Sequence, residues 1–198
     1  MKTLLLSALS LLVAQTAFAS TWEIDPAHSN AGFTVKHMMI STVRGEFQNV
    51  TGTVEVDDKD VTKSKIDVSI DATTINTRVA KRDTHLKGAD FFDVTKFPTI
   101  TFKSTKVEKN KEGKLLVTGD LTMHGITKPV TLTVNTLTEP VKGPFGNTAR
   151  GVQASGKVNR KDFGLIWNKS MEAGGVLVGD EVDLVIDAEL NPKTPAKT

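Results

Sequence analysis

The sequence predicts an all-β fold, an antiparallel β-barrel of about eight strands accompanied by one short helix. Several segments alternate between apolar and polar residues, turn residues separate them at hairpin length, and one segment breaks the alternation. A sandwich of two sheets is the alternative, because the pattern alone does not distinguish closure from stacking. Closure would remove exposed sheet edges, which favours the barrel.

The chain begins with the features of an export signal. Lys2 supplies a positive charge, residues 4–14 form an apolar run broken by serines, and Ala17-Phe18-Ala19 offers small residues to a signal peptidase. The run is too short for a membrane anchor, so we expect no stable membrane insertion. Cleavage after Ala19 removes 19 of the 198 residues and leaves 179, with the mature protein in the periplasm.

Composition restricts what this mature domain does. The chain has no cysteine, which excludes disulfides, thiol catalysis and thiolate metal sites. Its 25 basic and 23 acidic residues are interspersed, so no basic face predicts nucleic-acid binding. We expect one barrel domain over residues 20–190 and a disordered tail over residues 191–198, which holds two prolines and two lysines.

The strands are predicted from alternation with period two, which gives each one an apolar face and a polar face. The clearest cases are 66–71, 99–103, 114–123, 131–136 and 182–189. Turn residues lie between strands at 57–60, 110–113, 125–129 and 140–147. Connections this short favour an antiparallel meander over parallel α/β units.

Residues 78–92 show no alternation and contain good helix formers, with Gly88 placed to end a helix. We predict a helix of two or three turns here, in which Arg82 and Asp83 form a buried pair that anchors it. A second short turn of helix is predicted near residues 164–170.

Four glycines fall on the apolar faces of predicted strands, where bulky residues are usual: Gly45, Gly52, Gly119 and Gly156. They either leave the lumen empty for a ligand or mark sharp bends in the barrel wall, and the sequence does not decide between these. No charged residue shares these faces, so any cavity is expected to be apolar.

No motif predicts catalysis, a metal ion or a cofactor. The four histidines lack the helical spacing of a zinc hydrolase. Asp25, His28 and Ser29 include the residue types of a hydrolase triad, but we interpret this segment as a turn because triads depend on geometry and not adjacency. We therefore predict that the protein is not an enzyme.

Two apolar groups lie in unusual places. Met38, Met39 and Ile40 are consecutive, and they pack in the core or form an adaptable lip at an opening; we favour the core. Trp167 lies in a loop-like stretch with other apolar residues, where it plugs one end of the barrel or lines its gate.

Five blocks, in order, resemble the YceI family of periplasmic, lipocalin-like proteins. They are 22-WEIDPAHSNAGFTVKH-37, 43-VRGEF-47, 82-RDTHLKGADFFDVTKFPTITFKS-104, 119-GDLTMHGITKPV-130 and 159-NRKDFG-164. The resemblance covers nearly the whole mature chain. It implies an extended lipocalin-like barrel with the helix over one end, and it points to a homodimer.

The resemblance also implies a ligand with a long apolar tail, either a polyisoprenoid quinone or phenol or a fatty-acid-like lipid, held for transport or storage. On this basis we assign lumen contacts to Phe33, Val35, Phe47, Ile70, Phe102, Leu121, Leu132, Val134 and Trp167. Contacts to the ligand's head group are assigned to His28, Ser29, His37 and Arg160. The alternatives are a barrel with a filled lumen that binds a protein partner, and a lipid-modifying enzyme.

Overall fold

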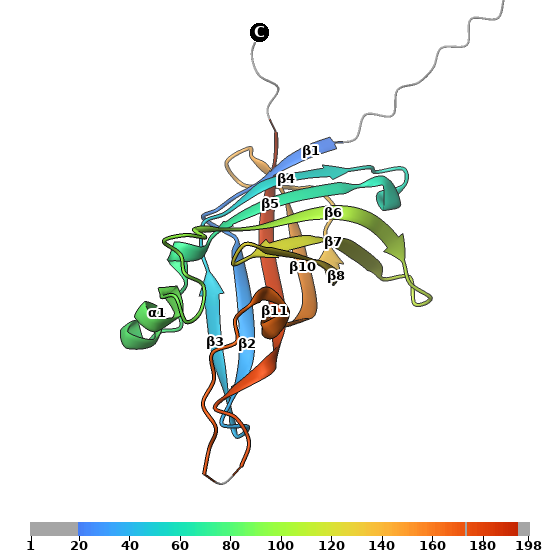
Figure 1. The fold of residues 1–198 in the computed structure, drawn as a ribbon. Helices are drawn as coiled ribbons and strands as arrows, with labels where there is room; N and C mark the ends of the chain where they lie inside the picture. The colour runs from blue at the N-terminus through green and yellow to red at the C-terminus, as the bar shows by residue number, and fades with distance from the viewer. Residues whose placement is uncertain (1–19, 173, 194–198) are drawn as a thin grey trace, which may run out of the picture.

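A computed structural model describes residues 20–172 and 174–193, and it shows a closed antiparallel barrel (Figure 1). Eight of the strands form a ring in which each strand pairs with its two neighbours, so the prediction of a closed barrel is confirmed. In ring order the strands are β11 (Val178–Pro192), β1 (Ser20–Ile24), β4 (Val50–Val56), β5 (Lys65–Asp71), β6 (Thr99–Lys109), β7 (Leu115–Met123), β8 (Ile126–Leu137) and β10 (Thr148–Asn159). The short β9 (Val141–Lys142) pairs with the start of β10.

A hairpin of β2 (Asn30–His37) and β3 (Ser41–Phe47) extends the wall past this ring. It reaches the ring through β11, whose last residues pair with β1 while Val178 to Asp187 pair with β2. In Figure 1 the hairpin lies at the lower end of the molecule, beside the segment that leads into β11. Its turn, Met38 to Ile40, is exposed, so the expectation that these residues pack in the core is wrong.

The helix α1 (Ala80–Lys87) lies outside the ring next to β3 and is shorter than the predicted 78–92. It ends at Gly88, as expected. Arg82 and Asp83 do not pair with each other; both bind Thr77. The Asp83 carboxylate accepts a 2.8 Å hydrogen bond from the Thr77 amide, and Arg82 Nη2 donates to the Thr77 carbonyl, also at 2.8 Å.

The described residues also form three 3-10 turns: η1 (Val61–Lys63), η2 (Ala72–Thr74) and η3 (Arg160–Phe163). The helical turn predicted at 164–170 therefore lies earlier in the chain. The Asn159 side chain accepts from the Lys161 amide and starts the turn, and Gly164, with φ 76°, ends it. Among the described residues, none of the helices combines the length and apolar character needed to cross a membrane.

Larger neighbouring side chains cover three of the four glycines on apolar faces. The Phe33 ring lies over Gly45, its partner in the strand register, and Leu132 lies over Gly156 in the same way. The Phe102 ring lies over Gly119, where the Lys103 carbonyl also approaches closely. These glycines therefore admit neighbouring side chains and close backbone contacts, and they are not themselves the hollow part of the lumen.

Strand β11 runs to Pro192, which pairs with Trp22. Asn191 and Pro192, expected in the tail, therefore belong to the barrel. The export signal over residues 1–19 and the tail residues 194–198 lie outside the described residues.

Candidate ligand-binding site

The barrel encloses an apolar cavity of about 180 Å³, called here the inner cavity. The ring strands, β2 and Phe47 at the end of β3 supply its walls, and none of the described residues that line it carries a polar side chain. Seven of the nine residues assigned to the lumen line it: Phe33, Phe47, Ile70, Phe102, Leu121, Leu132 and Val134. Alternation places the five on ring strands here, because one face of every ring strand points inward. Phe33 and Phe47 reach the cavity from β2 and β3.

A second cavity of about 180 Å³, the outer cavity, lies between the β2–β3 hairpin, α1 and the segment leading into β11. The other two assigned lumen residues, Val35 and Trp167, line this space instead, together with His37. Its walls are mixed, because Lys36, Arg82 and His85 lie among the apolar side chains. A site of this composition suits the polar end of an amphiphile.

Phe33 lines both cavities and so forms the boundary between them. Its ring lies 5.7 Å from the ring of Phe47, which in turn meets Phe92 edge to face at 5.3 Å. A long molecule that occupied both cavities would have to displace the Phe33 ring.

Replacement of Phe33 with alanine is expected to join the two cavities and to speed the exchange of bound lipid, because the ring no longer blocks the passage. The rate at which a fluorescent fatty acid is displaced by unlabelled lipid measures this. Ile126→Ala is the matched control, because Ile126 lines neither cavity. An unchanged exchange rate in Phe33→Ala would show that Phe33 is not the barrier.

Three aromatic rings form one wall of the outer cavity. The His85 ring meets the rings of Phe91 and Trp167 edge to face, at 5.1 and 5.0 Å between centroids, and Phe91 lies 5.2 Å from Trp167. His85 Nε2 also lies 2.9 Å from a carboxylate oxygen of Asp90, which orients the ring. Sequence reasoning missed His85, Phe91 and Lys36 as site residues.

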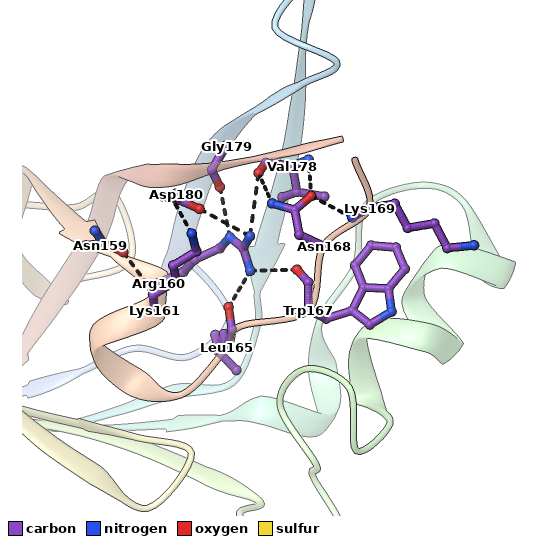
Figure 2. A network of polar contacts seen from close by, with 10 residues as sticks. All are labelled: Asn159, Arg160, Lys161, Leu165, Trp167, Asn168, Lys169, Val178, Gly179 and Asp180. Atoms are coloured by element: carbon purple, nitrogen blue, oxygen red, sulfur yellow. Dashed lines mark hydrogen bonds and ion pairs between the residues drawn. The ribbon is translucent and has the colours of Figure 1, made fainter. Parts of the chain in front are cut away.

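Arg160 holds the segment that carries Trp167 (Figure 2). Arg160 is 4% exposed, and its guanidinium donates to the backbone carbonyls of Leu165, Trp167 and Gly179, the last two at 2.9 Å. Burial lowers the pKa of Arg160, which the nearby Asp180 carboxylate opposes. The donors are used within the protein, and Arg160 lines neither cavity, so its predicted contact with a head group is replaced by a positioning role.

His28 and Ser29 also lie away from both cavities. The Ser29 hydroxyl is buried and accepts from the Glu189 amide at 3.1 Å, while His28 Nδ1 lies 2.9 Å from Asp25. These contacts support the interpretation of this segment as a turn. Asp25, His28 and Glu189 also place three potential ligand atoms within 4.8 Å of one another, but the Asp25 carboxylate already accepts from the Ala27 amide and from Asn191.

The contact between Asp25 and His28 predicts a pH dependence. The hydrogen bond from His28 lowers the pKa of Asp25, and the hydrogen bond to Asp25, reinforced by its charge, raises the pKa of His28. Any stability that this contact gives is present between the two folded-state pKa values. It is lost as pH falls through that of Asp25 or rises through that of His28.

In Asp25→Asn the titration midpoint of His28, followed by NMR, is therefore expected to fall. Glu189→Gln is the control, and it should lower the midpoint less, because only the charge of Glu189 acts on His28. The same midpoint in Asp25→Asn and the unchanged protein would contradict the assigned contact.

Comparisons with known proteins agree with this architecture. Protein YceI of Shigella flexneri is 38% identical over 178 residues, which cover 89% of each chain. A solved YceI protein of Campylobacter jejuni is 32% identical with a TM-score of 0.67, covering 80% of this chain and 90% of its own. A structure described as a polyisoprenoid binding domain from Saccharophagus degradans shares the fold at 14% identity, with a TM-score of 0.61 and coverage of 88% and 99%.

The model of the YceI-like domain matches residues 22–190, which span the ring strands, the β2–β3 hairpin and α1. This range includes all five sequence blocks that resemble the family. The chain therefore belongs to the YceI family.

Proposed function

We propose that this protein binds an amphiphilic lipid, with the apolar tail in the inner cavity and the polar head in the outer cavity, for transport or storage in the periplasm. The observation that carries this proposal is the pair of adjoining cavities, one wholly apolar and one mixed, that share Phe33. Apolar burial would supply affinity, and the few polar groups at one end would orient the ligand.

A polyisoprenoid quinone or phenol is the ligand class that we favour. Support comes from the YceI family membership and from the shared fold of the Saccharophagus degradans polyisoprenoid binding domain. The aromatic wall formed by His85, Phe91 and Trp167 is suited to stacking against a flat aromatic or quinone head. His37 provides a hydrogen-bond donor for its oxygens.

The size of the cavities limits how such a ligand can bind. The inner cavity, at about 180 Å³, is only slightly larger than an engineered cavity of about 150 Å³ that binds benzene. A tail of several isoprene units therefore has to extend through both cavities, displace Phe33 and push lining side chains apart. The barrel expands on binding in this proposal.

The proposal is one of binding and not of catalysis. The side chains that line the inner cavity, among the described residues, include no nucleophile and no ionisable group. The ionisable side chains that line the outer cavity are cationic or histidine. The Asp90 carboxylate beside His85 is outside the lining, and no serine is among the described residues that line this cavity. Covalent or acid–base chemistry on a buried tail would need such groups within hydrogen-bond reach.

A series of isoprenoid quinones with increasing tail length tests the proposal. Each added unit buries further methyl and methylene groups, so affinity is expected to rise by about tenfold or more per unit until the space is filled. Saturated fatty acids of matching length serve as the comparison series. Affinity that does not depend on tail length, or no binding of either series, would contradict the proposal.

A further inference from the structure

The turn of the β2–β3 hairpin exposes three consecutive apolar side chains, called here the hairpin tip. Met38 is 40% exposed, Met39 59% and Ile40 82%. The tip lies at the lower end of the molecule in Figure 1, where β2 and β3 extend beyond the ring. Exposed apolar residues this concentrated mark an interaction site more often than a plain surface.

The backbone of the tip is unusual for these residues. Met38 and Met39 have φ values of 51° and 61°, in the left-handed region. A tight hairpin with two such residues strongly favours Asn-Gly, because these residues adopt positive φ at little cost. Strain of this kind is typical of functional segments, and here two flexible, adaptable side chains are kept at an exposed position.

Three cationic residues lie on the hairpin and on the segment next to it. Lys36 and Arg44 lie on one face of the hairpin. Lys169 lies in the neighbouring segment, and its backbone carbonyl accepts a hydrogen bond from the Leu177 amide. The carbonyl of Leu177 accepts in turn from the Met38 amide at 2.8 Å, so the two segments touch. Within the described part of the chain none of these three cations forms an ion pair. Glu172 is the acidic residue of the segment that carries Lys169.

We propose that the hairpin tip docks on an anionic phospholipid bilayer, with its three apolar side chains in the interface and the cations against the lipid head groups. Apolar residues combined with basic residues are the composition that binds such interfaces. His37, directly before the tip, lines the outer cavity. Docking would therefore bring the part of that cavity lined by His37 close to the bilayer from which lipid is taken.

The shape of the tip favours a bilayer over a protein partner. A stable protein interface buries about 800 Å² on each side over a broad surface. Three side chains on a two-stranded turn, with the loop before β11 beside them, offer a narrow end of the molecule that can enter a fluid interface without a complementary surface. The inference rests on the proposed lipid binding, because it names the source of the lipid.

Flotation with vesicles of phosphatidylcholine alone or mixed equally with phosphatidylglycerol tests the inference. The protein is expected to float with the mixed vesicles and to bind them more weakly as salt is raised. A triple variant that combines Met38→Asn, Met39→Gly and Ile40→Thr should bind the mixed vesicles about tenfold more weakly or worse. Its thermal midpoint should be equal or higher, because Asn and Gly suit the backbone of the turn.

Phe145→Ser is the matched control. Phe145 is 95% exposed and lies in the turn between β9 and β10. The start of β10, which follows this turn, pairs with the last residues of β11, at the end of the barrel away from the tip. This variant should float like the unchanged protein. Equal loss of flotation in Phe145→Ser and in the tip variant would overturn the inference, because the effect would not belong to the tip.

Other outcomes separate the two proposals. Protein that takes up quinone from a detergent dispersion but never floats would overturn docking and leave lipid binding intact. Protein that floats through the tip but takes up no lipid would overturn lipid binding and leave docking intact. A dimer in light scattering that dissociates in the tip variant, without flotation of the unchanged protein, would assign the tip to a second copy and overturn the inference.

Discussion

Replacement of Leu132 with tryptophan is expected to weaken the binding of long-tailed lipids by about a hundredfold or more. Leu132 lines the inner cavity and lies over Gly156 on the neighbouring strand. The indole is far larger than the leucine side chain, and the space into which it would project measures about 180 Å³. The ring would occupy the room that the proposal assigns to the lipid tail.

Isothermal titration with an isoprenoid quinone measures this loss of affinity, and Phe102→Trp should reproduce it from another wall of the cavity. Val185→Trp is the matched control, because Val185 is exposed and does not line either cavity. Overpacking should cost about 1–3 kcal/mol of stability, so circular dichroism must show that the variants are folded. Folded variants with unchanged affinity would place the lipid outside the inner cavity.

Replacement of Arg160 with methionine should destabilise the fold by about 3 kcal/mol or more, since it leaves several buried carbonyls without donors. The guanidinium donates to the carbonyls of Leu165 and Trp167 and also to that of Gly179, the second residue of β11 (Figure 2). Methionine matches much of the volume and supplies none of these hydrogen bonds. The free energy of unfolding in urea measures the change.

Arg160→Lys should restore only part of the stability, because a single ammonium group cannot reproduce the planar fork of the guanidinium. Lys161→Met is the neighbouring control. Lys161 Nζ pairs with Asp180 at 2.8 Å in an exposed contact, which should contribute about 1 kcal/mol or less. If Arg160→Met unfolds at the same urea concentration as the unchanged protein, the positioning role is wrong.

The strands were predictable because alternation reports local burial. The predicted strands 66–71 and 131–136 lie within observed strands, and 114–123 matches β7 except for Lys114. The turn predicted over 125–129 is wrong, because β8 begins at Ile126 and residues 126–129 pair with β7. The length of β11 was not predictable, because its pairing with both β1 and β2 depends on where the hairpin attaches. The helix was shorter than its composition suggested, since the residues after Gly88 turn back to contact it.

The inner and outer cavities differ in how far the sequence could describe them. Inward-facing residues of the ring follow from strand parity, and five of the residues assigned to the lumen lie on ring strands and line the inner cavity. The outer cavity joins β2, β3, α1 and the segment before β11, and no local pattern indicates that these meet. The residue types of Ser29 and Arg160 suggested ligand contacts, but both are used to bind backbone groups, which sequence alone does not show.

The most direct test of the proposed function is native mass spectrometry of the protein purified from the organism that makes it, with organic extraction of any bound molecule. Lipid binding through the two cavities is expected to give a discrete adduct whose extract shows a series spaced by isoprene or methylene units. A mass equal to that of the bare chain, still unchanged after incubation with isoprenoid quinones and fatty acids, would contradict it.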